Sequence, residues 1–117
     1  EHLEQTRNHV ARLEEIFDML DLDAEGVDCP AIDGILEEAD DVSGEVEDKR
    51  VLDAALIAAA QAVEHYEITR YGTLMAWAEE AGREDCARLL KQTLDEERAA
   101  DKKLTQIAES EVNLKAA

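Results

Sequence analysis

The chain has few of the residues that interrupt helices or build disulfide frameworks. Its 117 residues include one proline, five glycines and two cysteines. So few prolines and glycines leave long helices uninterrupted. Cys29 and Cys86 lack a CxxC spacing, so they do not indicate a zinc or redox motif. We expect both to be small buried apolar residues that are not bonded to each other, in a reducing compartment.

Basic residues and long apolar runs are also scarce. Twelve Lys and Arg stand against 30 Asp and Glu, giving a formal net charge of −18. The phosphates of nucleic acids and anionic membranes would be repelled, so we expect neither as a partner. No transmembrane span or secretory signal pattern is visible, and we expect a cytoplasmic protein. The acidity indicates either a cation as counter-species or adaptation to a salt-rich cytoplasm.

Apolar residues at helical spacing predict one all-α domain over residues 1–117. Residues 1–20 carry such a stripe, with steps of three and four between Leu3, Thr6, Val10, Leu13, Phe17 and Leu20. The segment 49–81 is alanine-rich and apolar on more than one face, so we expect it to be the most buried helix. A last helix is predicted over 83–110. No strand pattern or internal repeat appears.

The connection between the first two long helices predicts the topology. It spans about 28 residues, too many for a simple hairpin, and contains a short helix that begins near Pro30. Such a crossover allows the first two long helices to run parallel. Gly82 predicts a tight turn, which makes the last two helices antiparallel. The sequence thus predicts an up-down helical bundle with one long crossover.

Four carboxylates interrupt the apolar stripes of the two C-terminal helices. Glu64 and Glu67 lie between Ile57 and Leu74 in one helix, and Glu97 and Asp101 follow Leu94 in the other. Buried carboxylates repel one another unless cations lie between them. Iron and manganese accept carboxylate and imidazole ligands, so the pattern favours a dinuclear iron or manganese site within the bundle.

Histidines of the first helix are candidate nitrogen ligands for this site, and the inward carboxylates also have explanations that need no metal. His2 and His9 flank the apolar stripe of the first helix, and His2 is the stronger candidate for a nitrogen ligand. Alternatively, Glu64 and Glu67 lie at the bundle edge beside Arg70 or Arg98. In a separate alternative, Glu97 and Asp101 are surface residues of an amphipathic helix, with Glu97 bridging to Arg98 or Lys102. The two tyrosines are better explained as core residues than as redox centres.

Three stretches resemble the YciE/YciF family of bacterial ferritin-like proteins. They are HLEQTRNHVARLE (2–14), RVLDAALIAAAQAVEHYEITRYGTL (50–74) and LLKQTLDEERAADKKLTQIAE (89–109). The resemblance covers nearly the whole chain and implies a ferritin-like four-helix bundle, often dimeric, in cytosolic proteins linked to stress responses. It also implies a di-metal centre whose enzymatic role is not established.

The resemblance carries a set of metal ligands onto this chain. The implied ligands are His2, Glu4, Glu64, Glu67, Glu97 and Asp101. The family has an additional N-terminal bundle helix with a glutamate ligand, and this chain begins at what resembles the second helix. Gln5 also stands where the family often has glutamate.

Two functions compete at this point. The first is a metal-binding protein with oxidase-type or protective chemistry on iron or manganese. The second is a non-enzymatic structural or stress dimer whose buried carboxylates are satisfied by Arg and Tyr. In either case we expect an apolar patch formed by Leu52, Leu56, Ala59, Val63 and Tyr66 to be covered. The chain would either dimerise through this patch or retain a separate helix bound there.

Overall fold

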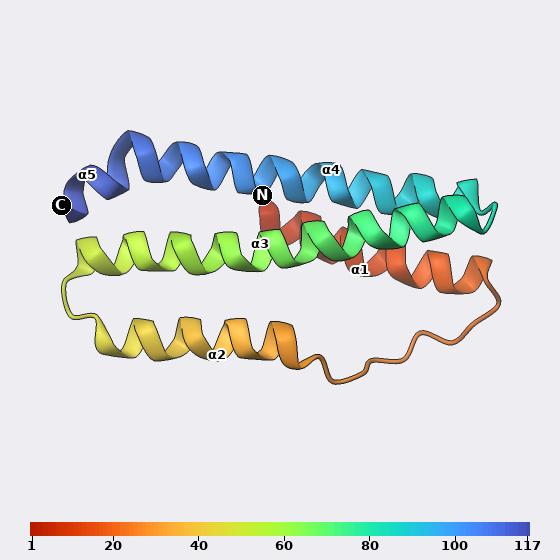
Figure 1. Ribbon diagram of the computed structural model, residues 1–117, viewed down its shortest axis with the longest axis horizontal. Helices are drawn as coiled ribbons and strands as arrows, with labels where there is room; N and C mark the ends of the chain where they lie inside the picture. The colour runs from red at the N-terminus through yellow and green to blue at the C-terminus, as the bar shows by residue number, and fades with distance from the viewer. The chain divides into compact units, whose positions relative to one another are not determined.

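The structure is a computed structural model that describes all residues from 1 to 117, and it confirms the all-α prediction. Four long helices follow in order: α1 (His2–Met19), α2 (Pro30–Glu45), α3 (Lys49–Glu80) and α4 (Glu84–Ile107) (Figure 1). A π-helical turn, η1 (Ala108–Val112), and the short α5 (Asn113–Ala116) close the chain. No helix combines the length and apolar character needed to cross a membrane.

Local chemistry explains where the helices begin and end. Pro30 occupies the first turn of α2, where its missing N–H costs nothing. The turn between α3 and α4 places Gly82 at φ +69°, and the Arg83 amide donates to the Ala78 carbonyl. Asp21 adopts φ 56° after α1, and the Leu22 amide donates to the Phe17 carbonyl. Helices α1 and α3 therefore both end in a residue of left-handed conformation, a position that favours Gly and tolerates Asp.

The chain forms two compact units that share the two longest helices. The first unit contains residues 1–28 and 67–98, and the second contains residues 29–66 and 99–117. The first therefore holds α1 with the second half of α3 and most of α4. The second holds α2 with the first half of α3 and the end of α4.

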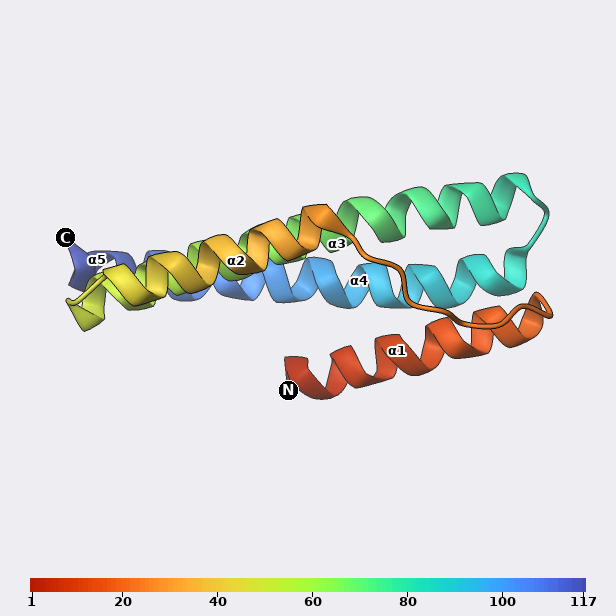
Figure 2. The same cartoon turned by 90° about the horizontal axis from the view of Figure 1, so that it is seen from below.

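In the first unit, α1 runs antiparallel to α4 and therefore parallel to the second half of α3, as the crossover predicts. The Arg83 guanidinium, at the start of α4, donates to the Met19 carbonyl at the end of α1. Figure 2 shows α1 lying along α4. Ile16, Cys86 and Leu90 form the buried core, and Met75 packs against it.

The inward face of α1 differs from the predicted stripe. Leu3 and Val10 are 66% and 54% exposed, whereas His9 is only 4% exposed and Ile16 is buried. The face of α1 that meets α4 is shifted by about one residue from the predicted apolar stripe, and it carries polar residues. The prediction that the helix over residues 49–81 is the most buried one was also wrong, because six residues of α4 are buried and only Glu64 of α3 is.

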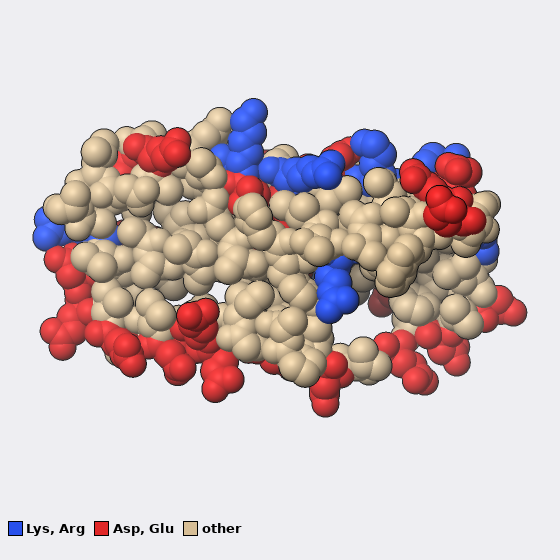
Figure 3. Space-filling model, in the orientation of Figure 1, with Lys and Arg blue, Asp and Glu red and all other residues tan.

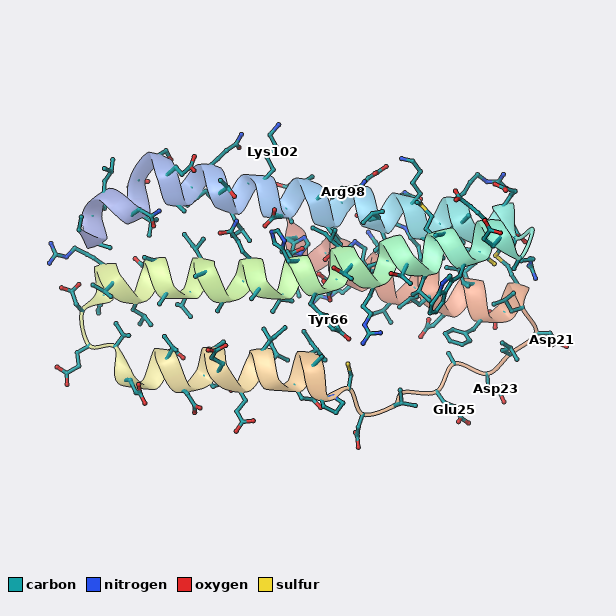
Figure 4. The ribbon with its side chains drawn as sticks, in the orientation of Figure 1. Asp21, Asp23, Glu25, Tyr66, Arg98 and Lys102 are labelled. Atoms are coloured by element: carbon teal, nitrogen blue, oxygen red, sulfur yellow. The ribbon has the colours of Figure 1, made fainter.

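In the second unit, the three-residue connection between α2 and α3 makes these helices antiparallel. At the start of α2, the Cys29 thiol lies 2.8 Å from the Tyr66 hydroxyl. In Figure 4, Tyr66 projects from α3 toward the start of α2. Acidic side chains cover the outer face of α2 (Figure 3). Both cysteines of the chain are free thiols.

We predict opposite stability changes for two glycine-to-alanine variants. Gly72 lies within α3, and an added Cβ would meet no atom within 4 Å, so Gly72→Ala should raise the free energy of unfolding by about 1 kcal/mol. Gly82→Ala should lower it by about 1 to 2 kcal/mol, because alanine disfavours positive φ. Urea unfolding of both variants tests this. A destabilised Gly72→Ala protein would show that something packs closely against that position.

Candidate metal centre

Glu97 is the most deeply buried carboxylate of the chain, with an exposed fraction of 0%. It follows Leu90 and Leu94 on one face of α4 at steps of four and three, so the leucines that pack the core also carry the glutamate inward. This burial contradicts the alternative in which Glu97 is a surface residue. A buried carboxylate needs hydrogen-bond donors or positive charge around it.

Two histidines from α1 approach this carboxylate within the first unit. The Nδ1 atom of His9 is 3.0 Å from Oε1 of Glu97, and Nε2 of His2 is 4.0 Å from the same oxygen. The seven-residue spacing between the histidines equals about two helical turns, which places both on the face that meets α4. The site therefore combines one buried carboxylate with two imidazoles.

A second carboxylate contacts His9 from the opposite side of its ring. Oε2 of Glu96 lies 3.3 Å from Nε2 of His9, and Oε1 of Glu96 lies 2.7 Å from Nη2 of Arg12. Arg12 also donates from Nη1 to the Thr93 hydroxyl at 3.2 Å. Burial, the largest single effect, favours the neutral acid, but the hydrogen bonds and charges of Arg12 and His9 together hold the pKa of Glu96 below its ordinary value. Burial lowers the pKa of His9, and the hydrogen bond and charge of Glu96 only partly offset this effect.

Tyr71 and Glu67 on α3 face the same region. The Tyr71 ring lies edge-on to His9, with the ring centroids 6.3 Å apart. Burial raises the pKa of Tyr71 to about 12, and the negative charges of Glu67 and Glu97 act in the same direction. The phenol is thus protonated at neutral pH. Glu67 itself is half-buried.

The other candidate ligands have different surroundings. Glu64 is buried on α3, one helical turn before Glu67, and belongs to the second unit. In that unit, Oδ1 of Asp101 lies 3.0 Å from Nε2 of His65 and accepts a hydrogen bond from the Gln61 amide at 3.2 Å. The Glu4 side chain is 69% exposed and pairs with Arg7, so the structure does not bring it to Glu97.

Sequence reasoning ranked His9 below His2 and did not single out Glu96 or Arg12, which the structure places beside His9 and Glu96 respectively. The prediction followed the larger apolar residues of α1, which placed the histidines on its flank. A signal was nevertheless present in the spacing. His2, His9 and Ile16 recur every seven residues and define a second face. A polar face of this kind is recognisable only when the acidic pair on the neighbouring helix is considered with it.

Comparisons with known proteins agree on one family. The family model described as "Domain of unknown function (DUF892)" matches residues 1–117. The protein YciF of Escherichia coli strain K12 is 47% identical over 116 residues, covering 98% of this chain and 70% of the relative.

Two solved structures are similar. The crystal structure of the E. coli stress protein YciF matches with a TM-score of 0.89 at 47% identity, covering 96% of this chain and 71% of that one. YcfI from Rhodopseudomonas palustris, described as a proposed structural protein, matches with a TM-score of 0.89 at 56% identity, covering 92% and 68%. These matches confirm the resemblance inferred from the sequence, and the chain belongs to the DUF892 family as a relative of YciF.

Proposed function

We propose that this chain is a ferritin-like, stress-associated protein that binds iron or manganese at a carboxylate-rich dinuclear site. One observation carries the proposal: Glu97 is fully buried, and imidazole nitrogens of His9 and His2 lie 3.0 and 4.0 Å from its carboxylate. A stress role is supported by the E. coli relative, which is described as a stress protein.

The donor chemistry fits such an ion. Carboxylate oxygens and neutral imidazole nitrogens suit divalent iron and manganese, whereas no thiol, the preferred ligand of softer ions, lies among these residues. Glu97, Glu67 and His2 are the ligands we assign, and all three lie within the first unit. Glu64, the other buried carboxylate predicted as a ligand, lies one helical turn before Glu67 on α3. Asp101 contacts His65 and Gln61 within the second unit, and Glu4 pairs with Arg7, so we assign neither as a ligand.

The chain's own residues prepare this site for a cation. A bound iron or manganese ion would supply redox chemistry toward oxygen or peroxide. Burial of Glu97 excludes bulk water, which strengthens the attraction between the carboxylate and a cation. Tyr71 keeps its proton at neutral pH and therefore adds a neutral hydroxyl rather than a further negative charge.

A second function, that of a non-enzymatic structural dimer, is favoured by different observations. Large apolar side chains remain exposed on α1 and α3, including Val10, Leu56 and Trp77. The relative from R. palustris is described as a proposed structural protein. Part of the predicted dimer patch is covered within the second unit, because Ala59 lines a groove with α2 and Tyr66 contacts Cys29. Leu56 stays exposed and is the residue through which we propose self-association.

Metal binding can be tested with a matched pair of glutamate variants. Protein prepared without added metal should carry iron or manganese by elemental analysis and show anomalous scattering near Glu97. Glu97→Gln should abolish this, because the amide removes the buried charge. Glu4→Gln makes the same chemical change at an exposed position and should retain the metal. Equal metal content in wild type and Glu97→Gln would refute the proposal.

Manganese should also stabilise the wild-type fold. At a free concentration of 100 times the dissociation constant, a ligand that binds only the folded state adds about 2.7 kcal/mol to the free energy of unfolding. We therefore expect a rise in the urea midpoint of wild type and Glu4→Gln on adding Mn²⁺, and none for Glu97→Gln.

The raised pKa of Tyr71 predicts a specific loss of stability in alkali. Its folded-state pKa is about 12 against an ordinary value of 10.0. The unfolded chain therefore ionises first, and the contribution of Tyr71 is complete below pH 10 and lost as the pH rises toward 12. Wild type should lose urea resistance over this window relative to Tyr71→Phe. Parallel stability curves for the two proteins would contradict the burial of this hydroxyl.

Self-association should depend on Leu56 and on salt. Each chain carries a net charge of −18, so screening should tighten a dimer. Light scattering across a salt series should show dimers for wild type and fewer for Leu56→Asp. Leu114→Asp, at another exposed leucine, is the control and should behave as wild type. A monomer at every salt concentration would exclude the structural dimer.

A further inference from the structure

His9 has a carboxylate at each ring nitrogen although it is only 4% exposed. Nε2 lies 3.3 Å from Glu96 and Nδ1 lies 3.0 Å from Glu97. A neutral imidazole has one N–H donor and one lone pair. One of the two contacts therefore places a lone pair opposite a carboxylate oxygen, unless the ring carries a second proton or a cation binds between them.

The surroundings of Glu96 determine which nitrogen carries the proton. The Arg12 guanidinium lies 2.7 Å from Oε1 of Glu96 and is held by its bond to Thr93, so Glu96 is ionised. The contact between Nε2 of His9 and the other oxygen of Glu96 has hydrogen-bond geometry, so we assign the ring proton to Nε2. The lone pair of the neutral ring is then on Nδ1 and points at Oε1 of Glu97.

We propose that His9 binds the metal ion through Nδ1 beside Glu97, and that Glu96 and Arg12 act as positioning residues for its ring. This inference rests on the proposed function and names a nitrogen ligand that the sequence ranked low. Two ligand atoms about 2.1 Å from one ion at right angles are about 3.0 Å apart. The 3.0 Å between Nδ1 of His9 and Oε1 of Glu97 fits neighbouring ligands of one ion.

The role of Glu96 follows from general features of metal sites. A histidine ligand commonly donates its other N–H to a carboxylate, which fixes the ring orientation and raises the basicity of the ligating nitrogen. Loss of such a carboxylate typically weakens metal binding by about 10- to 100-fold. Glu96 occupies this position, and Arg12 keeps it ionised. The competing explanation is an imidazolium held between two carboxylates, which would leave no lone pair for a metal.

NMR of the wild-type protein with ¹⁵N-labelled histidine tests the ligand assignment directly. Zn²⁺ serves as a diamagnetic probe for the site. We expect the Nδ1 resonance of His9 to move to a metal-bound position while Nε2 keeps its proton. A ring that keeps both protons, or that shows no response to Zn²⁺, would overturn the assignment. This measurement needs no variant and does not depend on enzymatic turnover.

Calorimetric titration with Mn²⁺ tests the positioning role. Glu96→Gln should bind Mn²⁺ about 10- to 100-fold more weakly than wild type. Asp95→Asn is the matched control, because Asp95 is the adjacent carboxylate and pairs only on the surface with Lys91. Equal weakening in both variants would show a general charge effect and refute the positioning role.

The outcomes separate this inference from the proposed function. If wild type binds Mn²⁺ and His9→Gln binds it equally well, His9 is not a ligand, but the metal-binding function stands. If wild type binds neither ion, both the function and this inference are wrong. If Glu96→Gln fails to fold, as judged by near-ultraviolet circular dichroism, the Zn²⁺ titration of wild type still decides whether Nδ1 is a ligand.

Discussion

The burial of the Glu97 carboxylate constrains much of the first unit. A charge removed from water must be neutralised, paired or bound to a cation, and an apolar neighbour could do none of these. This requirement explains why α1 presents His2, His9 and Arg12 to α4, whereas its Leu13 packs against the apolar core. Leu3 is left on the outside as a consequence. The polar face of α1 is thus the complement of the acidic pair on α4.

The apolar core that accompanies this polar site is small. The buried apolar residues of the first unit are Ile16, Cys86, Ala87, Leu90 and Leu94. A small core provides little net stability, because the conformational entropy lost on ordering the chain offsets nearly all of the free energy gained by burying apolar surface. An ion or a second copy that binds only the folded state would therefore contribute a large share of the total. The two functional proposals share this consequence, because a bound metal ion and a second copy of the chain would each stabilise a fold whose apolar core is small.

The helices and their order could be predicted because the deciding signals are local. Pro30 and Gly82 mark helix boundaries through backbone geometry alone, and the length of the crossover sets the direction of α3. The burial of Glu64 and Glu97 was also predictable from their positions on apolar stripes.

The face of α1 could not be predicted in the same way. Two stripes compete along this helix, one through Leu3 and Val10 and another through His9 and Ile16, and local spacing supports both. The choice depends on Glu96 and Glu97, more than 80 residues away in sequence. The contact of Asp101 with His65 likewise depends on the register between α3 and α4, which spacing within one helix does not reveal.

The connection after α1 has a practical consequence for chemical and proteolytic mapping. Its residues from Asp21 to Asp28 are all exposed, and Asp21, Asp23 and Glu25 point outward in Figure 4. No Lys or Arg occurs between Arg12 and Lys49, so trypsin has no cleavage site there despite the exposure. A trypsin digest therefore releases α2 and Cys29 together in one acidic peptide, residues 13–49, whereas a glutamate-specific protease can cut at Glu25 within the connection itself.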